Sequence, residues 1–291
     1  MPPVPPRTHR PRVVVYHQTH FGPDGQFVPL LPLVTEGAES VGLTHLIIAA
    51  IHVNEKPGDI NLNNDPPDHP RNAPLWDEVA ILQDTGVKAL GMLGGAAKGT
   101  YERLDGSDED FEAFYVPLRE VLRHHRFDGL DLDVEEDMSL QGILRLIDKL
   151  ILDFGNAFII TLAPVATALQ GRRHLSGFDY EALEVMRGSS IAWYNTQFYN
   201  NWGSLETFVD YDAILRKGFK PEKIVVGVLT HPGSGHGYVE HGELLKTLSA
   251  LNQFYPGFGG IFGWEYFNSI PGDTARPFEW AHMMSKILSK P

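Results

Sequence analysis

Eight strand-and-helix units in a chain of 291 residues predict an α/β protein, a closed (β/α)8 TIM barrel formed by a single domain. Apolar, β-rich runs recur at regular spacing, and a helix-length amphipathic stretch follows each run. Strands that alternate with helices form a parallel sheet, and eight such units favour a closed barrel over an open doubly wound sheet. The 43% share of apolar residues is enough for one large core at this length.

The eight expected strands are apolar runs: Arg12–Gln18, Thr44–Ile51, Val87–Leu93, Phe127–Val134, Phe158–Ala163, Ile191–Tyr199, Lys223–Leu229 and Gly259–Trp264. Apolar residues at helical spacing predict the clearest helices: Phe111–His124, Ser139–Phe154, Glu243–Phe254 and Phe278–Leu288. The barrel is therefore expected to span residues 12–291 as one domain. The Pro-rich residues 1–11 precede it and are expected to form a disordered tail.

One connection, His52–Pro74, is unusually long and crowded with Asn, Asp and Pro. We expect it to lack regular secondary structure, because its apolar residues show little periodicity. It follows the second expected strand, so it lies on the barrel face that carries catalytic residues in TIM barrels. The sequence does not decide between two roles for this connection, a functional loop and a solvent-exposed loop without a function.

The composition excludes several classes of protein. The net charge is −13, from 37 acidic and 24 basic residues, and no basic block interrupts it, so neither a nucleic acid nor an anionic membrane is an expected partner. The longest apolar run, Leu46–Ile51, is too short to span a bilayer. Because Cys is absent, disulfides, thiolate zinc sites and cysteine nucleophiles are excluded.

The start of the chain lacks the apolar segment of a secretory signal, and the sequence contains no Asn-x-Ser/Thr acceptor. We therefore expect a cytoplasmic protein, or a secreted one if a leader has been removed. We expect the protein to be a monomer.

The segment Phe127–Glu136, FDGLDLDVEE, carries the most chemical information. Side chains alternate between the two faces of a strand, so Asp131, Asp133 and Glu135 are expected to point together into the barrel. Such a column is costly without a purpose, because each ionised carboxylate taken from water loses on the order of several kcal/mol. Neighbouring carboxyls also repel, so at least one keeps its proton near neutral pH. Glu135 comes last, at the mouth of the barrel, and is the candidate general acid.

A solvated strand edge and a metal site are the two alternative roles of these carboxyls. A hard cation would suit them, but the sequence shows no further oxygen ligands, so we expect neither a metal nor a cofactor. Asp128, at the start of the strand, is expected to bind backbone groups near the bottom of the barrel.

Four motifs together resemble glycoside hydrolase family 18, which contains chitinases and endo-β-N-acetylglucosaminidases. DGLDLDVE at Asp128–Glu135 resembles the fourth-strand signature of the family. Gly91–Gly95 (GMLGG) is similar to its third-strand glycine motif, Gln197–Asn200 (QFYN) to its sixth-strand motif, and Gly263–Trp264 to its eighth-strand tryptophan. The resemblance extends along nearly the whole chain. Stretches such as LPLVTEG, ITLAPVA and WYNTQFYN are most similar to single-domain fungal enzymes of the Endo T type, which cleave N-glycans within the core di-N-acetylglucosamine.

The resemblance implies a substrate-assisted mechanism. In it, Glu135 protonates the glycosidic oxygen, and the 2-acetamido oxygen of the −1 N-acetylglucosamine attacks the anomeric carbon to form an oxazolinium ion. Asp133 orients the acetamide nitrogen, and Asp131 shares a proton with Asp133. Water then opens the oxazolinium with Glu135 as the base, so the resemblance implies that the anomeric configuration is retained.

Other strand ends supply candidate substrate-binding residues. By alternation, Asn195, Gln197 and Tyr199 share a face, which places an amide and a phenol where an acetamide carbonyl needs donors. Tyr199 is expected to polarise the acetamide, with Gln197 supporting it. Trp264 is expected to form the hydrophobic floor beneath the −1 sugar. Packing in the core is the alternative role of Tyr199 and Trp264.

Three further residues are expected in the site, and a fourth, Glu136, is expected beside it. Tyr16 lies on the inward face of the first strand and is a candidate for contact with substrate. Gly94 and Gly95 let the chain approach the carboxyls without a Cβ clash. Glu136 stands where the similar fungal enzymes usually have Gln, and its carboxylate is expected to raise the pKa of Glu135 or to alter a contact with substrate.

The first functional hypothesis is an endo-β-N-acetylglucosaminidase that acts on N-linked glycans or glycoproteins. An endochitinase with the same catalytic residues is the nearest alternative. The connection His52–Pro74 contains no aromatic residue, which favours the glycan, because a chitin groove is lined with stacked aromatics. A barrel that binds glycans without cleaving them is a further alternative, which the presence of Glu135 and Tyr199 disfavours.

Overall fold

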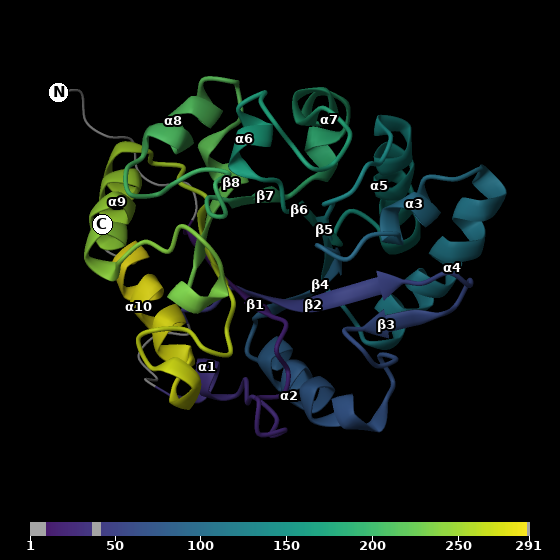
Figure 1. Cartoon of the computed structure of the whole chain (residues 1–291), viewed down its shortest axis with the longest axis horizontal. Coiled ribbons are helices and arrows are strands. Elements are labelled where there is room, and N and C mark those ends of the chain that lie inside the picture. The colour runs from purple at the N-terminus through teal and green to yellow at the C-terminus, as the bar shows by residue number, and fades with distance from the viewer. Residues whose placement is uncertain (1–9, 37–41, 290–291) are drawn as a thin grey trace.

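The computed structural model describes residues 10–36 and 42–289. Eight parallel strands form the predicted closed barrel, and helices surround it (Figure 1). β2 pairs with both β1 and β4, and β1 pairs with β9, which closes the ring. The barrel strands are β1 (Arg12–His17), β2 (His45–Val53), β4 (Lys88–Gly94), β5 (Gly129–Asp133), β6 (Ile159–Leu162), β7 (Trp193–Gln197), β8 (Ile224–Leu229) and β9 (Gly260–Trp264).

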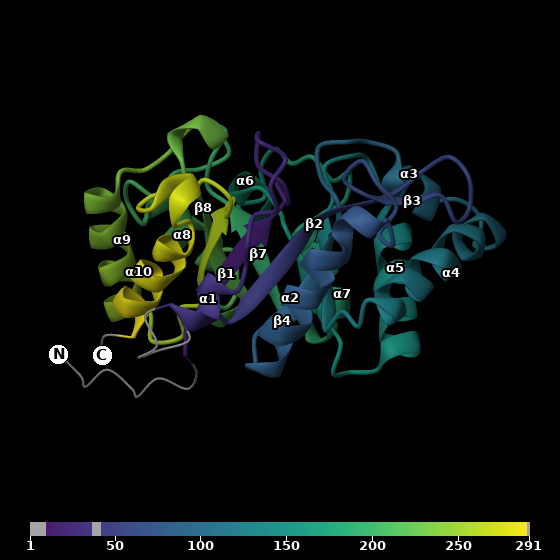
Figure 2. The same cartoon turned by 90° about the horizontal axis from the view of Figure 1, so that it is seen from below.

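Helices cover the outer face of the barrel, as two views at right angles show (Figures 1 and 2). They are α1 (Pro32–Thr35), α2 (Ala73–Asp84), α3 (Thr100–Leu104), α4 (Asp108–His124), α5 (Leu140–Phe154), α6 (Ala166–Leu169), α7 (Tyr180–Arg187), α8 (Val209–Leu215), α9 (His241–Phe254) and α10 (Phe278–Leu288). Short 3-10 turns are η1 (Pro70–Asn72), η2 (Gly188–Ser190), η3 (Pro221–Lys223), η4 (Pro232–Ser234) and η5 (Asp273–Ala275). The predicted helices all form and begin within three residues of their expected starts.

Alternation along the strands sorts the apolar side chains into two layers. Val13 and Val15 of β1 and Leu132 of β5 belong to the cluster between the barrel and the helices. Val14 and Tyr16 belong to the smaller cluster inside the barrel. Because the apolar residues of β5 face the helices, its carboxyls point into the barrel, as predicted.

Local hydrogen bonds fix both ends of the segment that carries the carboxyls. At its start, Asp128 accepts a hydrogen bond from the backbone N–H of Ala89 at 3.0 Å and pairs with Lys88 at 2.9 Å. This confirms the structural role expected for Asp128. At its end, Ser139 caps α5 by accepting a hydrogen bond from the N–H of Gly142 at 2.9 Å. Glu135 therefore lies on a short connection that is anchored on both sides.

The connection His52–Pro74 contains regular structure, so the expectation that it lacks any was wrong. β2 continues to Val53 and forms a hairpin with an antiparallel strand, β3 (Ile60–Leu62). Ile60 and Leu62 are buried, which makes the hairpin part of the core. A strand of three residues is too short to give a periodic signal in the sequence. In Figure 2, β3 lies at the same end of the barrel as α3.

The predicted disordered tail, residues 1–11, lies outside the described residues except for Arg10 and Pro11. Nη2 of Arg10 donates a hydrogen bond to Oγ of Ser289 at 2.9 Å, so the start of the described chain lies beside its end. Within residues 10–36 and 42–289, no helix has the length and apolar character that crossing a membrane requires.

Candidate active site

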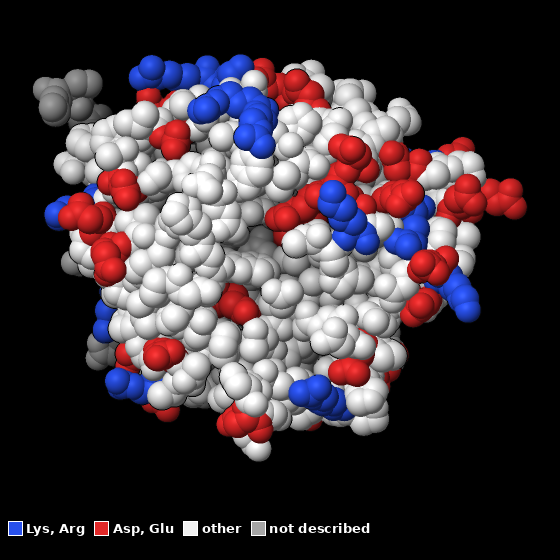
Figure 3. All heavy atoms as spheres, in the orientation of Figure 1, with Lys and Arg blue, Asp and Glu red and all other residues white. Residues whose placement is uncertain are grey.

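A hollow opens at the centre of the face drawn in Figure 3, and acidic side chains lie near it. The cavity has a volume of about 400 Å³, which is within the range of small-molecule sites. Most of the predicted site residues line it: Gly94, Gly95, Asp133, Glu135, Gln197, Tyr199 and Trp264. The remaining three, Tyr16, Asp131 and Asn195, do not line the cavity and are buried.

Asp131 lies fully buried at the base of the acidic column. Its Oδ2 accepts a hydrogen bond from the hydroxyl of Tyr16 at 2.6 Å. Its Oδ1 accepts hydrogen bonds from the hydroxyl of Thr161 at 2.5 Å and from the amide of Asn195 at 3.0 Å. Burial raises the pKa of Asp131, and these three donors oppose that rise because they stabilise the anion. Tyr16 and Asn195 thus bind Asp131 and do not reach the cavity, so the substrate contact expected of them is not seen in the structure.

Asp133 and Glu135 share one donor near the mouth of the cavity. Nε2 of Gln197 lies 3.3 Å from Oδ1 of Asp133 and 3.3 Å from Oε1 of Glu135, and it donates to the carbonyl of Ala163 at 2.9 Å. The pKa of Asp133 is raised well above its usual value by burial and then by the charges of Glu135 and Asp131. Burial also raises the pKa of Glu135, while the hydrogen bond from Gln197 opposes this rise. Burial and the neighbouring charges thus favour the protonated form of Asp133, and burial shifts the pKa of Glu135 in the direction that suits a general acid.

The resemblance implied a proton shared between Asp131 and Asp133. No hydrogen bond joins these two carboxyls in the part of the chain that the structure describes, because both oxygens of Asp131 accept from other donors. Their coupling in this conformation is electrostatic, through the effect of Asp131 on the pKa of Asp133.

Two glycines bring β4 close to the acidic column. Gly94 pairs with Asp133 across the sheet, and the N–H of Gly95 donates to the carbonyl of Asp133 at 2.9 Å. A Cβ on Gly94 would lie 2.4 Å from Cε2 of Tyr101 and 2.7 Å from the carbonyl oxygen of Asp133. The φ angles of +88° and +94° also favour glycine at both positions. The predicted close approach is confirmed.

Tyr199 and Trp264 supply the other walls of the cavity. Tyr199 is 6% exposed, and its hydroxyl makes no hydrogen bond to any described residue. Its pKa is raised well above the usual value by burial and then by the charges of Asp133 and Glu135. The phenol therefore keeps its proton and can donate a hydrogen bond to a ligand. Trp264 ends β9, and its ring lies 5.6 Å from that of Tyr16 at an angle of 56°. It presents an apolar surface to the cavity.

Glu136 does not shift the pKa of Glu135, so the first of the two roles expected for this residue was wrong. Its side chain turns to the start of α3, where Oε2 accepts from the N–H of Gly99 at 2.6 Å and Oε1 accepts from the N–H of Tyr101 at 2.7 Å. These are the backbone donors that a helix leaves unsatisfied at its first turn. Glu136 is buried and is not among the groups that shift the pKa of Glu135. It fastens α3 to the end of β5.

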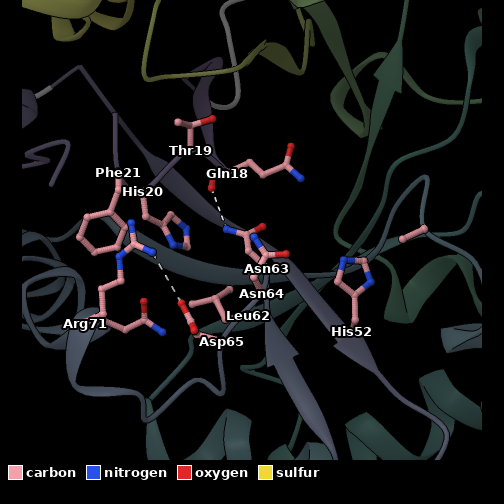
Figure 4. Close-up of a pocket in the computed structure, with 12 residues that line it drawn as sticks. Gln18, Thr19, His20, Phe21, His52, Leu62, Asn63, Asn64, Asp65 and Arg71 are labelled. Carbon is pink, nitrogen blue, oxygen red and sulfur yellow. Dashed lines mark hydrogen bonds and ion pairs between the residues drawn. The ribbon is translucent and has the colours of Figure 1, made fainter. Parts of the chain in front are cut away.

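A second cavity of about 520 Å³ opens beside the first, between the segment after β1 and the β2–β3 hairpin (Figure 4). Gln18, His52 and Ala97 line both cavities, so the two are contiguous. Asn63 braces the shared wall, because its Oδ1 accepts from the N–H of Ala50 at 3.1 Å and its Nδ2 donates to the carbonyl of Gln18 at 2.8 Å. The hairpin therefore forms a fixed wall of the second cavity.

Several polar groups of the second cavity are available to a ligand. The side chains of Gln18, His52 and Asn64 make no hydrogen bonds to the residues that the structure describes, and Figure 4 shows them around the open space. Phe21 also lines this cavity, but the guanidinium of Arg71 covers its ring, 4.0 Å from the ring centre. The lining thus offers hydrogen bonds rather than a bare stacking surface.

Sequence reasoning missed Thr161, His52 and Asn64. Thr161 could have been found, since it is the one polar residue in the run Phe158–Ala163. His52 and Asn64 could not, because the hairpin that places them was not predicted.

Comparison with known proteins identifies the family. The profile of Glycosyl hydrolases family 18 matches residues 12–238. A solved fungal endo-β-N-acetylglucosaminidase of that family is 46% identical, with a TM-score of 0.92, over 96% of this chain and 98% of that one. The chitinase ChiC from Aspergillus fumigatus is 56% identical, with a TM-score of 0.88, over 96% of this chain and 99% of that one.

A curated relative, Chitinase 2 of Rhizopus oligosporus, is 30% identical over 209 residues. The match covers 65% of this chain and 35% of that protein, so the chain spans about a third of the length of this relative. The profile match, the barrel and the relatives agree, and the chain belongs to glycoside hydrolase family 18.

Proposed function

We propose that this family 18 glycosidase is an endo-β-N-acetylglucosaminidase that hydrolyses the β-1,4 bond in the N,N′-diacetylchitobiose core of N-linked glycans. The observation that carries the chemistry is the acidic column. Asp133 and Glu135 are the only carboxyls lining the cavity within the described part of the chain; Asp133 ends β5, and Glu135 follows it by two residues. Both pKa values are raised, which favours acid catalysis at the mouth of the barrel.

The placement of the carboxyls favours a nucleophile supplied by the substrate. A retaining glycosidase that uses two carboxylates places them on either side of the scissile bond, about 5–5.5 Å apart. Here the second carboxyl lies two residues before the first on the same strand end, and the opposite walls carry Tyr199 and Trp264 instead. The 2-acetamido oxygen of the −1 sugar takes the place of the missing nucleophile.

In the first step, Glu135 donates its proton to the glycosidic oxygen as the bond from that oxygen to the anomeric carbon breaks. The acetamide oxygen forms a bond to the same carbon. Meanwhile Asp133 accepts a hydrogen bond from the acetamide N–H, and Tyr199 donates a hydrogen bond to the acetamide oxygen. In the second step, water attacks the anomeric carbon and gives a proton to Glu135, which opens the oxazolinium with retention. Holding the acetamide in line replaces a bimolecular attack by an intramolecular one.

The rim of the site favours a branched N-glycan over chitin. The polar second cavity opens sideways from the acidic one and leaves Gln18, His52 and Asn64 free to bind sugar hydroxyls. A linear chitin chain instead needs a groove of exposed aromatic rings. The likeness to the fungal endo-β-N-acetylglucosaminidase over nearly the whole chain supports the same choice.

An endochitinase is the second candidate, and one observation favours it directly: the 56% identity to the chitinase ChiC from Aspergillus fumigatus. The two candidates share Glu135, Asp133 and Tyr199, so they differ only in the substrate that the rim accepts.

The test is to incubate the purified protein with a high-mannose glycoprotein and, separately, with a chitin hexamer, and to measure product masses. We expect the protein product to keep one N-acetylglucosamine of the core on each cleaved site, and the released glycan to end in the other N-acetylglucosamine. The Glu135→Gln variant is the control for contaminating activity. Cleavage of the hexamer with an untouched glycoprotein would replace our proposal by the chitinase.

A further inference from the structure

Three potential metal ligands meet on the outside of the barrel, apart from the residues assigned to the glycosidase site. Asp68 lies between β3 and η1, while His124 ends α4 and His125 follows it. One ligand atom from each lies within 4.8 Å of the other two. The cavity beside them is lined by residues of α2, including Trp76.

The distances from Asp68 to the two histidines fit the ligand spacing around a tetrahedral ion. Oδ1 of Asp68 lies 3.2 Å from Nε2 of His124 and 3.1 Å from Nε2 of His125. Bonds of about 2.0–2.1 Å from zinc to nitrogen and oxygen place neighbouring tetrahedral ligands roughly 3.3 Å apart. An ion could therefore enter between these atoms with little rearrangement.

His125 is held in the orientation of a ligand. Its side chain is 5% exposed, and its ring stacks on Trp76 with centroids 3.9 Å apart and planes at 22°. Its Nε2 is buried and makes no well-directed hydrogen bond within the described chain, although Asp68 is close by. A cation bound between Nε2 of His125 and the carboxylate of Asp68 would contact both groups at once.

We propose that Asp68, His124 and His125 form a Zn²⁺ site. Two imidazole nitrogens and one carboxylate suit zinc, whereas Ca²⁺ and Mg²⁺ prefer oxygen ligands. The side chains of Asp68 and His124 are 70% and 68% exposed, so the ion can enter from solvent and water can take the fourth position. Binding ties the segment before η1 to the end of α4. The proposal does not depend on which glycan the enzyme cleaves.

The experiment is calorimetric titration of the tag-free full chain with ZnCl₂ at pH 7.5, with MgCl₂ titrated in parallel. We expect one Zn²⁺ per chain, no comparable Mg²⁺ binding, and a melting temperature that rises with Zn²⁺ concentration. Asp68→Asn and His124→Gln should each weaken binding by about 100-fold, and both residues are exposed enough for the variants to fold.

His69→Gln is the matched control. His69 lines the same cavity, but its Nδ1 accepts a hydrogen bond from the N–H of Arg71 at 3.2 Å, and it is not one of the three grouped ligands. We expect this variant to bind Zn²⁺ as the parent does. The proposal is overturned if the parent takes up no Zn²⁺, or if both Asp68→Asn and His124→Gln bind it with unchanged affinity.

Discussion

Replacing Gly94 by alanine tests how closely β4 must approach the acidic column. Two costs can be separated at this position. The φ angle of +88° is unfavourable for any residue with a Cβ and costs about 1–2 kcal/mol. The added Cβ would also lie 2.4 Å from the ring of Tyr101 and 2.7 Å from the carbonyl oxygen of Asp133, an overpacking that costs about 1–3 kcal/mol. The variant should therefore lose about 2–5 kcal/mol of unfolding free energy.

Gly86→Ala is the matched control, because Gly86 has a φ of +97° and nothing within 4 Å of its added Cβ. It should show only the backbone cost. Urea unfolding of both variants, followed by circular dichroism, measures the difference, which is the cost of the contacts with Tyr101 and Asp133. Gly94→Ala should also lower kcat by about 100-fold, because it displaces Asp133. Equal losses of stability in the two variants, or an unchanged kcat in Gly94→Ala, would refute the reasoning.

Three further predictions concern the site. Tyr199→Phe should lower kcat by roughly 100- to 1,000-fold with little change in unfolding free energy, because it removes a donor to the acetamide oxygen; full activity would exclude that role. The value of kcat/KM should fall as pH rises through the raised pKa of Glu135, since the protonated form is the acid; a pH profile that climbs over that range would contradict the assignment. Glu136→Gln should lose about 1–3 kcal/mol of unfolding free energy, because an amide cannot accept hydrogen bonds from the N–H groups of both Gly99 and Tyr101. The pH profile of kcat/KM should stay unchanged in this variant. A shifted profile would show that Glu136 changes the pKa of Glu135.

The fold was predictable from the sequence because the eight strands carry strong and repeated signals. The alternation in the segment Phe127–Glu136 predicted that Asp131, Asp133 and Glu135 share one face, and the glycines at the end of β4 marked where the chain approaches that face. The β2–β3 hairpin was not predictable, since β3 has three residues and its burial depends on packing that no local pattern encodes.

The sequence predicted which way each side chain of the site points better than it predicted which groups that side chain contacts. Alternation places Tyr16 and Asn195 inside the barrel, but only the structure shows that they end on Asp131 and not in the cavity. Glu136 is next to Glu135 in the sequence, but consecutive side chains point to opposite sides of an extended chain. The side chain of Glu136 therefore points toward α3. Asp68 and His124 are far apart in sequence, so no spacing rule could join them.

The nucleophilic role of the substrate's own amide can be measured with one series of chitobiosides whose −1 sugar carries an N-acetyl, N-fluoroacetyl or N-trifluoroacetyl group. Fluorine withdraws electrons from the carbonyl oxygen without altering the scissile bond. If that oxygen attacks the anomeric carbon, kcat/KM should fall steeply with each added fluorine. Equal values across the series would contradict substrate assistance and would require a nucleophile from the protein.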